Sequence, residues 1–147
     1  MLRAYPSVIE FRDSNGFSGV MLRPDHIARM PRPDDVIAPA RFYIRIDYPL
    51  ENPVKIAINE PNPVTRRRFI ELVYREYSRL YQEDDESRTF PQQLTGSTPK
   101  DISEFLHGTP GVHGIYAHDL RDLALNDARL WHNNVYHLGV STYFDSF

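Results

Sequence analysis

The stretch Arg41-Phe42-Tyr43-Ile44-Arg45-Ile46-Asp47-Tyr48 alternates between apolar and polar side chains, and this alternation decides the fold class. Successive side chains of a β-strand point to opposite faces of a sheet, so the apolar members share one face. Residues 54–58 repeat the alternation, and the connection 49–53 between the two runs contains two prolines. We therefore predict a β-hairpin with one buried face.

A long amphipathic helix is predicted after this hairpin, over residues 63–83. Asn62 is a good N-cap residue, and proline suits the first helical position at Pro63. At ~100° per residue, one stripe of the helix collects its apolar side chains. These are Phe69, Ile70, Val73, Tyr77, Leu80 and Tyr81. The acidic run 83–86 opposes the helix dipole, which predicts that the helix ends there.

Two further hairpins are predicted near the ends of the chain. Asn15-Gly16 separates two β-prone runs, Val8 to Arg12 and Phe17 to Leu22, and Asn-Gly is a strong hairpin signal. Residues 123–131 and 135–144 flank a loop of three residues, 132–134, rich in side chains that tolerate the left-handed conformation. This loop length pairs Leu130 with Tyr136 and Ala128 with Leu138.

The segments between these elements are predicted from their prolines. Eight of the twelve prolines fall in residues 24–63, so residues 24–40 are predicted to form an extended, ordered loop. Ser97-Thr98-Pro99 offers a cap and a first-turn proline for a short helix over about 99–106. The predicted fold is therefore α+β. Antiparallel hairpins form one or two sheets packed against the helix at about 63–83, in a single globular domain of residues 1–147.

The composition excludes several classes of protein. The chain has no cysteine, which excludes disulfides and thiolate chemistry. We expect a soluble, intracellular protein without membrane association, because no apolar run approaches the ~18 to 20 residues of a membrane helix. A net charge of -3 argues against a protein that coats nucleic acid. The aromatic content of 12% is high and favours a protein interface.

The densest motif lies in residues 112–123. It contains His113, Gly114, Tyr116, His118, Asp119 and Asp122. Imidazole and carboxylate groups suit transition metals, but their spacing here matches no established ligand pattern. A turn that leads into a strand uses the same residues structurally, so we predict that His118 and Asp122 are structural. No catalytic residue, metal or cofactor is assigned. Convergence of these side chains in an open pocket would instead favour a metal-dependent enzyme.

Five arginines lie on the predicted helix, and they could contact phosphates. They are Arg66, Arg67, Arg68, Arg75 and Arg79. A nucleic-acid-associated factor that uses this arginine face is the first alternative function. Such a stripe is more often the solvated face of an amphipathic helix, neutralised in part by glutamates at helical spacing.

The chain resembles a small uncharacterised protein family of large DNA viruses of amoebae, which includes the marseillevirus group. The resemblance rests on Tyr77-Ser78-Arg79-Leu80-Tyr81 with its acidic continuation, and on Gly114-Ile115-Tyr116-Ala117-His118-Asp119-Leu120-Arg121-Asp122-Leu123 before a terminal hairpin. It covers about residues 65–140, and Ala117 stands where the family pattern has glycine. The resemblance implies a viral protein carried in the virion, acting with host-cell machinery in the cytoplasm or nucleus.

The function we favour from the sequence is a non-enzymatic interaction protein with a host or viral protein partner. A homodimer is also predicted, because residues 135–144 carry no Lys, Arg, Asp or Glu and need a cover if they form an edge strand. The N-terminal hairpin or a second copy of the chain could provide this cover. In the second case, Tyr143, Phe144 and Phe147 are the expected contacts.

Overall fold

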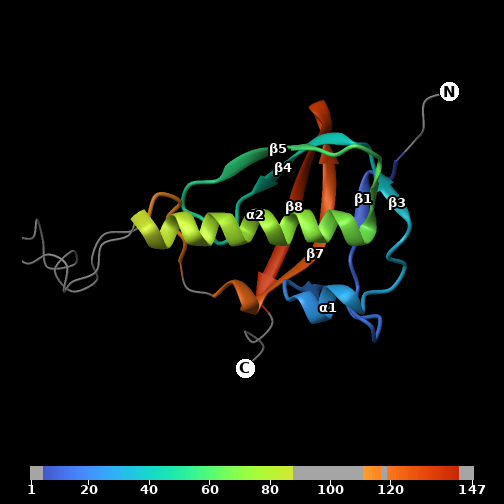
Figure 1. Cartoon of the computed structure of the whole chain (residues 1–147), viewed down its shortest axis with the longest axis horizontal. Coiled ribbons are helices and arrows are strands. Elements are labelled where there is room, and N and C mark those ends of the chain that lie inside the picture. The colour runs from blue at the N-terminus through green and yellow to red at the C-terminus, as the bar shows by residue number, and fades with distance from the viewer. Residues whose placement is uncertain (1–4, 88–110, 117–118, 143–147) are drawn as a thin grey trace, which may run out of the picture.

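The computed structural model describes residues 5–87, 111–116 and 119–142, and the predicted helix at 99–106 lies outside them. The fold is α+β, as predicted. One long helix, α2 (Arg66–Ser87), runs across one face of a sheet (Figure 1). The main sheet contains β1 (Val8–Glu10), β2 (Val20–Met21), β4 (Arg41–Ile46), β5 (Val54–Asn59), β7 (Leu123–Trp131) and β8 (Val135–Thr142). The other elements are α1 (Pro24–Ala28), a small sheet of β3 (Val36–Ala38) and β6 (Val64–Thr65), and the 3-10 turns η2 (Leu120–Asp122) and η3 (His132–Asn134).

The predicted hairpins that begin at Arg41 and at Leu123 are both confirmed. β4 pairs with β5 in antiparallel register, with Ile44 opposite Ile56. β7 pairs with β8 across a three-residue loop, and Leu130 lies opposite Tyr136 as predicted. Asn133 (φ 66°) and Asn134 (φ 59°) adopt the left-handed conformation in this loop. The loop therefore sets the register because asparagine tolerates this backbone geometry.

Strand β8 lies inside the sheet, in the order β1-β7-β8-β4-β5. It is antiparallel to β7 and parallel to β4, with Ile44 opposite Tyr136. The cover predicted for this strand is therefore internal, and β4 provides it over Val135–His137. Among the described residues, those at 138–141 pair with no strand on this side, so the argument for a second copy now applies only to that part of β8. The homodimer remains a prediction, and its expected contacts Tyr143, Phe144 and Phe147 lie outside the described residues.

The predicted N-terminal hairpin is correct at its turn, where Arg12 and Ser18 form an antiparallel bridge, and wrong in the outer parts of its strands. Asp13 accepts the backbone N–H groups of Asn15 and Phe17 with its side chain, at 2.9 and 3.0 Å, which fixes the turn. However, β1 and β2 both pair with β7. They form one interrupted strand along β7, and the turn protrudes from it where Gly19 donates to the carbonyl of Phe11 at 2.8 Å.

The proline-rich segment 24–40 is more structured than the predicted extended loop. It contains α1, which begins with Pro24 in its first turn, where proline costs no hydrogen bond. It also contains β3, which pairs with β6. Proline density thus excluded long helices here but did not exclude a single helical turn or a short strand.

Helix α2 differs from its predicted bounds at both ends. It begins at Arg66 because Val64 and Thr65 pair with β3, and the Thr65 hydroxyl caps the helix by accepting the N–H of Arg68 at 3.1 Å. It continues to Ser87, through the acidic run where we predicted its end. Glu83 in this run pairs with Arg79 at 2.9 Å, which offsets part of the unfavourable interaction with the helix dipole.

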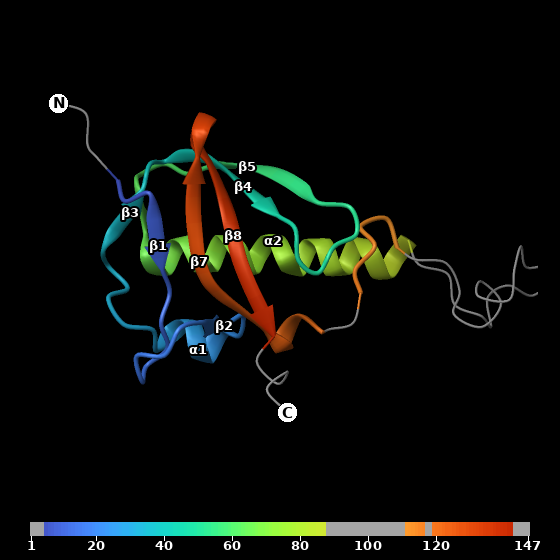
Figure 2. The ribbon, with the colours of Figure 1, turned by 180° about the vertical axis from the view of Figure 1, so that it is seen from behind.

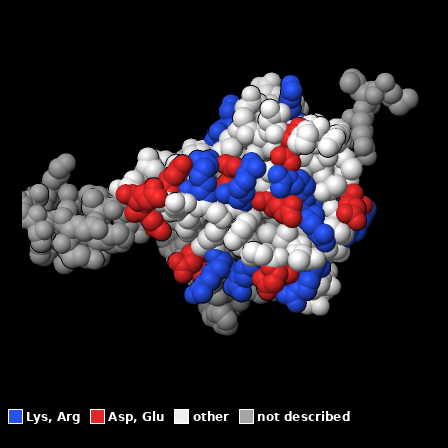
Figure 3. Space-filling model, viewed as in Figure 1, with Lys and Arg blue, Asp and Glu red and all other residues white. Residues whose placement is uncertain are grey.

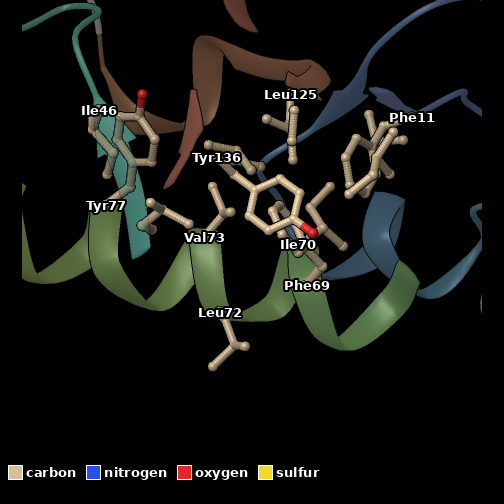
Figure 4. Close-up of a cluster of buried hydrophobic side chains, with 14 of the residues drawn as sticks. Phe11, Ile46, Phe69, Ile70, Leu72, Val73, Tyr77, Leu125 and Tyr136 are labelled. Carbon is tan, nitrogen blue, oxygen red and sulfur yellow. The ribbon is translucent and has the colours of Figure 1, made fainter. Parts of the chain in front are cut away.

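The core lies between α2 and the sheet and is centred on aromatic side chains (Figure 4). The Phe69 ring stacks on Phe42, with centroids 5.5 Å apart, and on Phe11, at 5.7 Å. Tyr136 from β8 meets the same ring edge to face at 5.6 Å. Phe69 therefore joins β4, β8 and the interrupted N-terminal strand in one cluster.

We predict that the folded protein loses stability at alkaline pH, because some of its tyrosine side chains are buried. Burial raises the pKa of Tyr136 to about 12, and it also raises the pKa of Tyr77 and Tyr81. The unfolded chain ionises these groups near ~10 and so loses protons first. The contribution of Tyr136 to stability is complete below about pH 10 and is lost as pH rises through about 12. Urea unfolding followed by circular dichroism should show this decline, and Tyr136→Phe should make it less steep. An unchanged slope in that variant would contradict the assignment.

Candidate functional site

Of the 112–123 motif, the described residues do not converge in one pocket. The His113 ring contacts a carboxylate oxygen of Glu83 at 2.8 Å and is only 13% exposed. Asp119 and Asp122 lie at the 3-10 turn η2, and Asp122 lines a cavity of about 490 Å³ between α1 and the turn at 13–16. Within the described residues, no group of three or more His, Asp or Glu side chains could hold a metal ion. His118 lies outside the described residues.

Residues 111–116 dock onto the C-terminal end of α2. The backbone N–H of His113 donates to the buried Asp84 carboxylate at 3.0 Å, and that of Val112 donates to the Ser87 hydroxyl at 2.8 Å. The hydrogen bond between the His113 ring and Glu83, together with a second from the Arg79 side chain, lowers the pKa of Glu83. These contacts hold the segment against the helix and explain how α2 continues through its acidic run.

The same segment also holds the loop that joins β4 to β5. Gly114 and His113 accept the backbone N–H groups of Glu51 and Asn52, at 3.0 and 3.2 Å. Ile115 forms a β-bridge with Leu50, and Gly114 adopts a φ of 63° that favours glycine. The Tyr116 ring meets Tyr48 edge to face at 6.0 Å. We call residues 111–116 the clamp, because they join the helix to this loop.

The five arginines of α2 are engaged within the molecule. Arg66 pairs with Asp35 at 3.0 Å, and Arg68 grips Glu60 with two nitrogens at 2.6 and 3.3 Å. Arg75 and Arg79 both bind Glu76, at 3.0 and 2.9 Å, and Arg67 donates to the carbonyl of Ala28. Basic and acidic side chains consequently alternate along this face (Figure 3). The arrangement is therefore a partly neutralised helix face rather than a uniform cationic stripe.

The opposite face of the sheet carries exposed aromatic side chains. No described helix lies over β7 and β8 on this side (Figure 2). Cross-strand register places a row of mainly apolar side chains there, which we call the aromatic row. It consists of Trp131, Val135, Tyr43 and Ala57. Trp131 is 54% exposed and Tyr43 is 40% exposed, so each presents ring surface to solvent.

A second row of side chains, the basic row, lies beside the aromatic row. Its members are Arg129, His137, Arg45 and Lys55, which the same registers place next to one another on β7, β8, β4 and β5. The His137 ring stacks on Trp131 with centroids 4.4 Å apart, and Lys55 lies 5.1 Å from the centre of the Tyr43 ring. Together the two rows form what we call the outer face.

Sequence reasoning missed the outer face as a site. The alternation in residues 41–48 indicates that Tyr43 and Arg45 share a side, and the three-residue loop gives the pairing of Trp131 with Val135. The missing information was that β8 pairs with β4, which brings these two hairpins together. No local pattern carries that information.

Comparisons with protein-family models, curated proteins and solved structures found no match for this chain. None of the helices among the described residues is both long and apolar enough to cross a membrane.

Proposed function

We propose that this protein is a non-enzymatic interaction module whose binding surface is the outer face. The observation that carries the proposal is the exposure of Trp131 and Tyr43 on a sheet face that no described helix covers. A few residues carry most of the binding energy at an interface, and tryptophan and tyrosine are enriched among them because their rings bury a large apolar area.

The other candidate residues already have bonding partners within the molecule, which supports the outer face as the binding surface. His113 and Gly114 belong to the clamp, and the arginines of α2 have partners within the molecule. These groups hold the fold together. The side chains of the aromatic row are not needed for that purpose, because the buried side of the same strands forms the core.

The biological setting belongs to the proposal as well. The motif resemblance to proteins of amoebal DNA viruses supports a virion-associated protein that acts in an infected cell, in the cytoplasm or nucleus. Its partner would then be a host or viral macromolecule bound at the outer face.

Simultaneous replacement of Tyr43 and Trp131 by serine should abolish capture of a macromolecular partner from an amoebal lysate. The matched control is Phe17→Ser, which removes another exposed aromatic, 66% exposed, from the protruding turn. Circular dichroism should show that both variants remain folded. The proposal fails if the double variant captures the same molecules as the unmodified protein, or if Phe17→Ser loses them equally.

A further inference from the structure

We propose that the outer face binds single-stranded nucleic acid, with bases stacked on Trp131 and Tyr43 and phosphates along the basic row. This inference rests on the proposed function, because it names the class of ligand for the same surface. It differs from the helix-face interpretation of the sequence, in which the arginines of α2 would contact phosphates.

The aromatic row has the geometry of a stacking platform. Trp131 and Tyr43 stand two strands apart, roughly 10 Å at the usual strand spacing. The His137 ring stacks on Trp131 with only 23° between the ring planes, and this contact holds the indole ring in place. Tyr43 and its cross-strand neighbour Ala57 line a hollow of about 250 Å³, which leaves space beside the Tyr43 ring. Unpaired bases stack on such exposed rings on a sheet surface.

The charges around the platform favour an anionic ligand. Arg45, Lys55 and Arg129 belong to the basic row, and Arg41 lies beside the aromatic row on the same side of β4. Asp47 pairs with Arg45 at 2.9 Å, and Asp127 pairs with Arg129 at 3.6 Å. Glu10, at the β1 border, is held by Arg12 at 3.0 Å. Within the described residues, Arg41 and Lys55 have no acidic partner. The face therefore carries excess positive charge on a chain whose net charge is -3.

The same features favour single strands over duplexes. The platform is the broad face of a sheet, whereas reading a duplex groove requires a helix or a ribbon that projects into it. Stacking also requires bases that are free of a pairing partner. The strand would lie with its bases over the aromatic row and its backbone over the basic row, since the two rows are adjacent.

The fluorescence of Trp131 gives a direct test, because it is the only tryptophan of the chain. Titration of the full chain with single-stranded oligothymidylate should quench this fluorescence. A duplex of equal length and polyglutamate, a polyanion without bases, should produce much weaker quenching. Quenching of equal strength by all three ligands would overturn the proposal, since it would indicate attraction by charge alone.

Matched variants separate stacking from charge, with binding followed by the anisotropy of a labelled oligonucleotide. Tyr43→Leu and Trp131→Leu should each weaken binding about tenfold, while Phe17→Leu should not change it. Lys55→Gln should reduce the slope of log affinity against log salt by about one, while Arg121→Gln, an exposed cation at η2, should leave the slope unchanged.

The result that overturns this inference is distinct from the one that overturns the proposed function. Absence of oligonucleotide binding, together with a lysate partner that resists nuclease and is lost in the double serine variant, would refute the nucleic-acid ligand and preserve the interaction module. A lysate partner that the double variant retains would refute both. Nuclease-sensitive capture that requires Tyr43 and Trp131 would support both.

Discussion

Replacement of Phe69 by alanine is expected to lower the free energy of unfolding by about 3–5 kcal/mol. The Phe69 ring is fully buried and contacts three other rings, from Phe11, Phe42 and Tyr136. Truncation removes the stacking contacts and leaves a cavity that these rigid neighbours fill poorly. Since domains are stable by about 5–15 kcal/mol, a large share of the total would be lost.

Urea denaturation followed by circular dichroism measures this effect. A suitable control is Phe17→Ala, which removes the same ring from an exposed position and should change stability by less than about 0.5 kcal/mol. A loss below about 1 kcal/mol for Phe69→Ala would mean that Phe69 is not at the centre of the core.

The substitution Gly111→Ala is expected to destabilise the protein by about 1–3 kcal/mol, by displacing the clamp from α2. A Cβ atom at this position would overlap both the carboxylate and the backbone oxygen of Asp84. Asp84 is buried, so the segment rather than the helix has to move. Hydrogen exchange should reveal lost protection at the N–H groups of Val112 and His113.

A second glycine separates this clash from backbone strain. Gly16 has a φ of 88° and open space around the position of an added Cβ, so Gly16→Ala introduces strain without a collision. It should cost about 1 kcal/mol and leave the exchange of residues 111–116 unchanged. Protection of Val112 and His113 that survives Gly111→Ala would show that the clamp does not depend on close contact with Asp84.

The elements confirmed from sequence are those specified by neighbouring residues. The alternation in residues 41–48 and 54–58 gave the β4–β5 hairpin, and the asparagines at 133 and 134 gave the register of β7 and β8. The apolar stripe gave the position of α2 but not its ends. Its start depends on the pairing of Val64 and Thr65 with β3, and its extension accompanies contacts with the clamp.

The predictions that were wrong concern contacts between residues that are far apart in the sequence. The Asp13 turn was correct because its hydrogen bonds are local, whereas β1 and β2 pair with β7, more than a hundred residues away. The outer face was missed for the same reason, because it exists only after β8 has paired with β4. The structural role predicted for His118 and Asp122 stays a prediction, and the helix and the loop that residues 111–116 join were not apparent from the sequence.

The strand order has a consequence for synthesis on the ribosome. β7 and β8 form the middle of the sheet, yet they are made after all of its other described strands. A nascent chain that ends before residue 123 has the β4–β5 hairpin and α2 but lacks the strands that complete their shared core. Such an intermediate exposes the apolar faces of both elements, and we expect it to need chaperone protection until β8 has emerged from the exit tunnel.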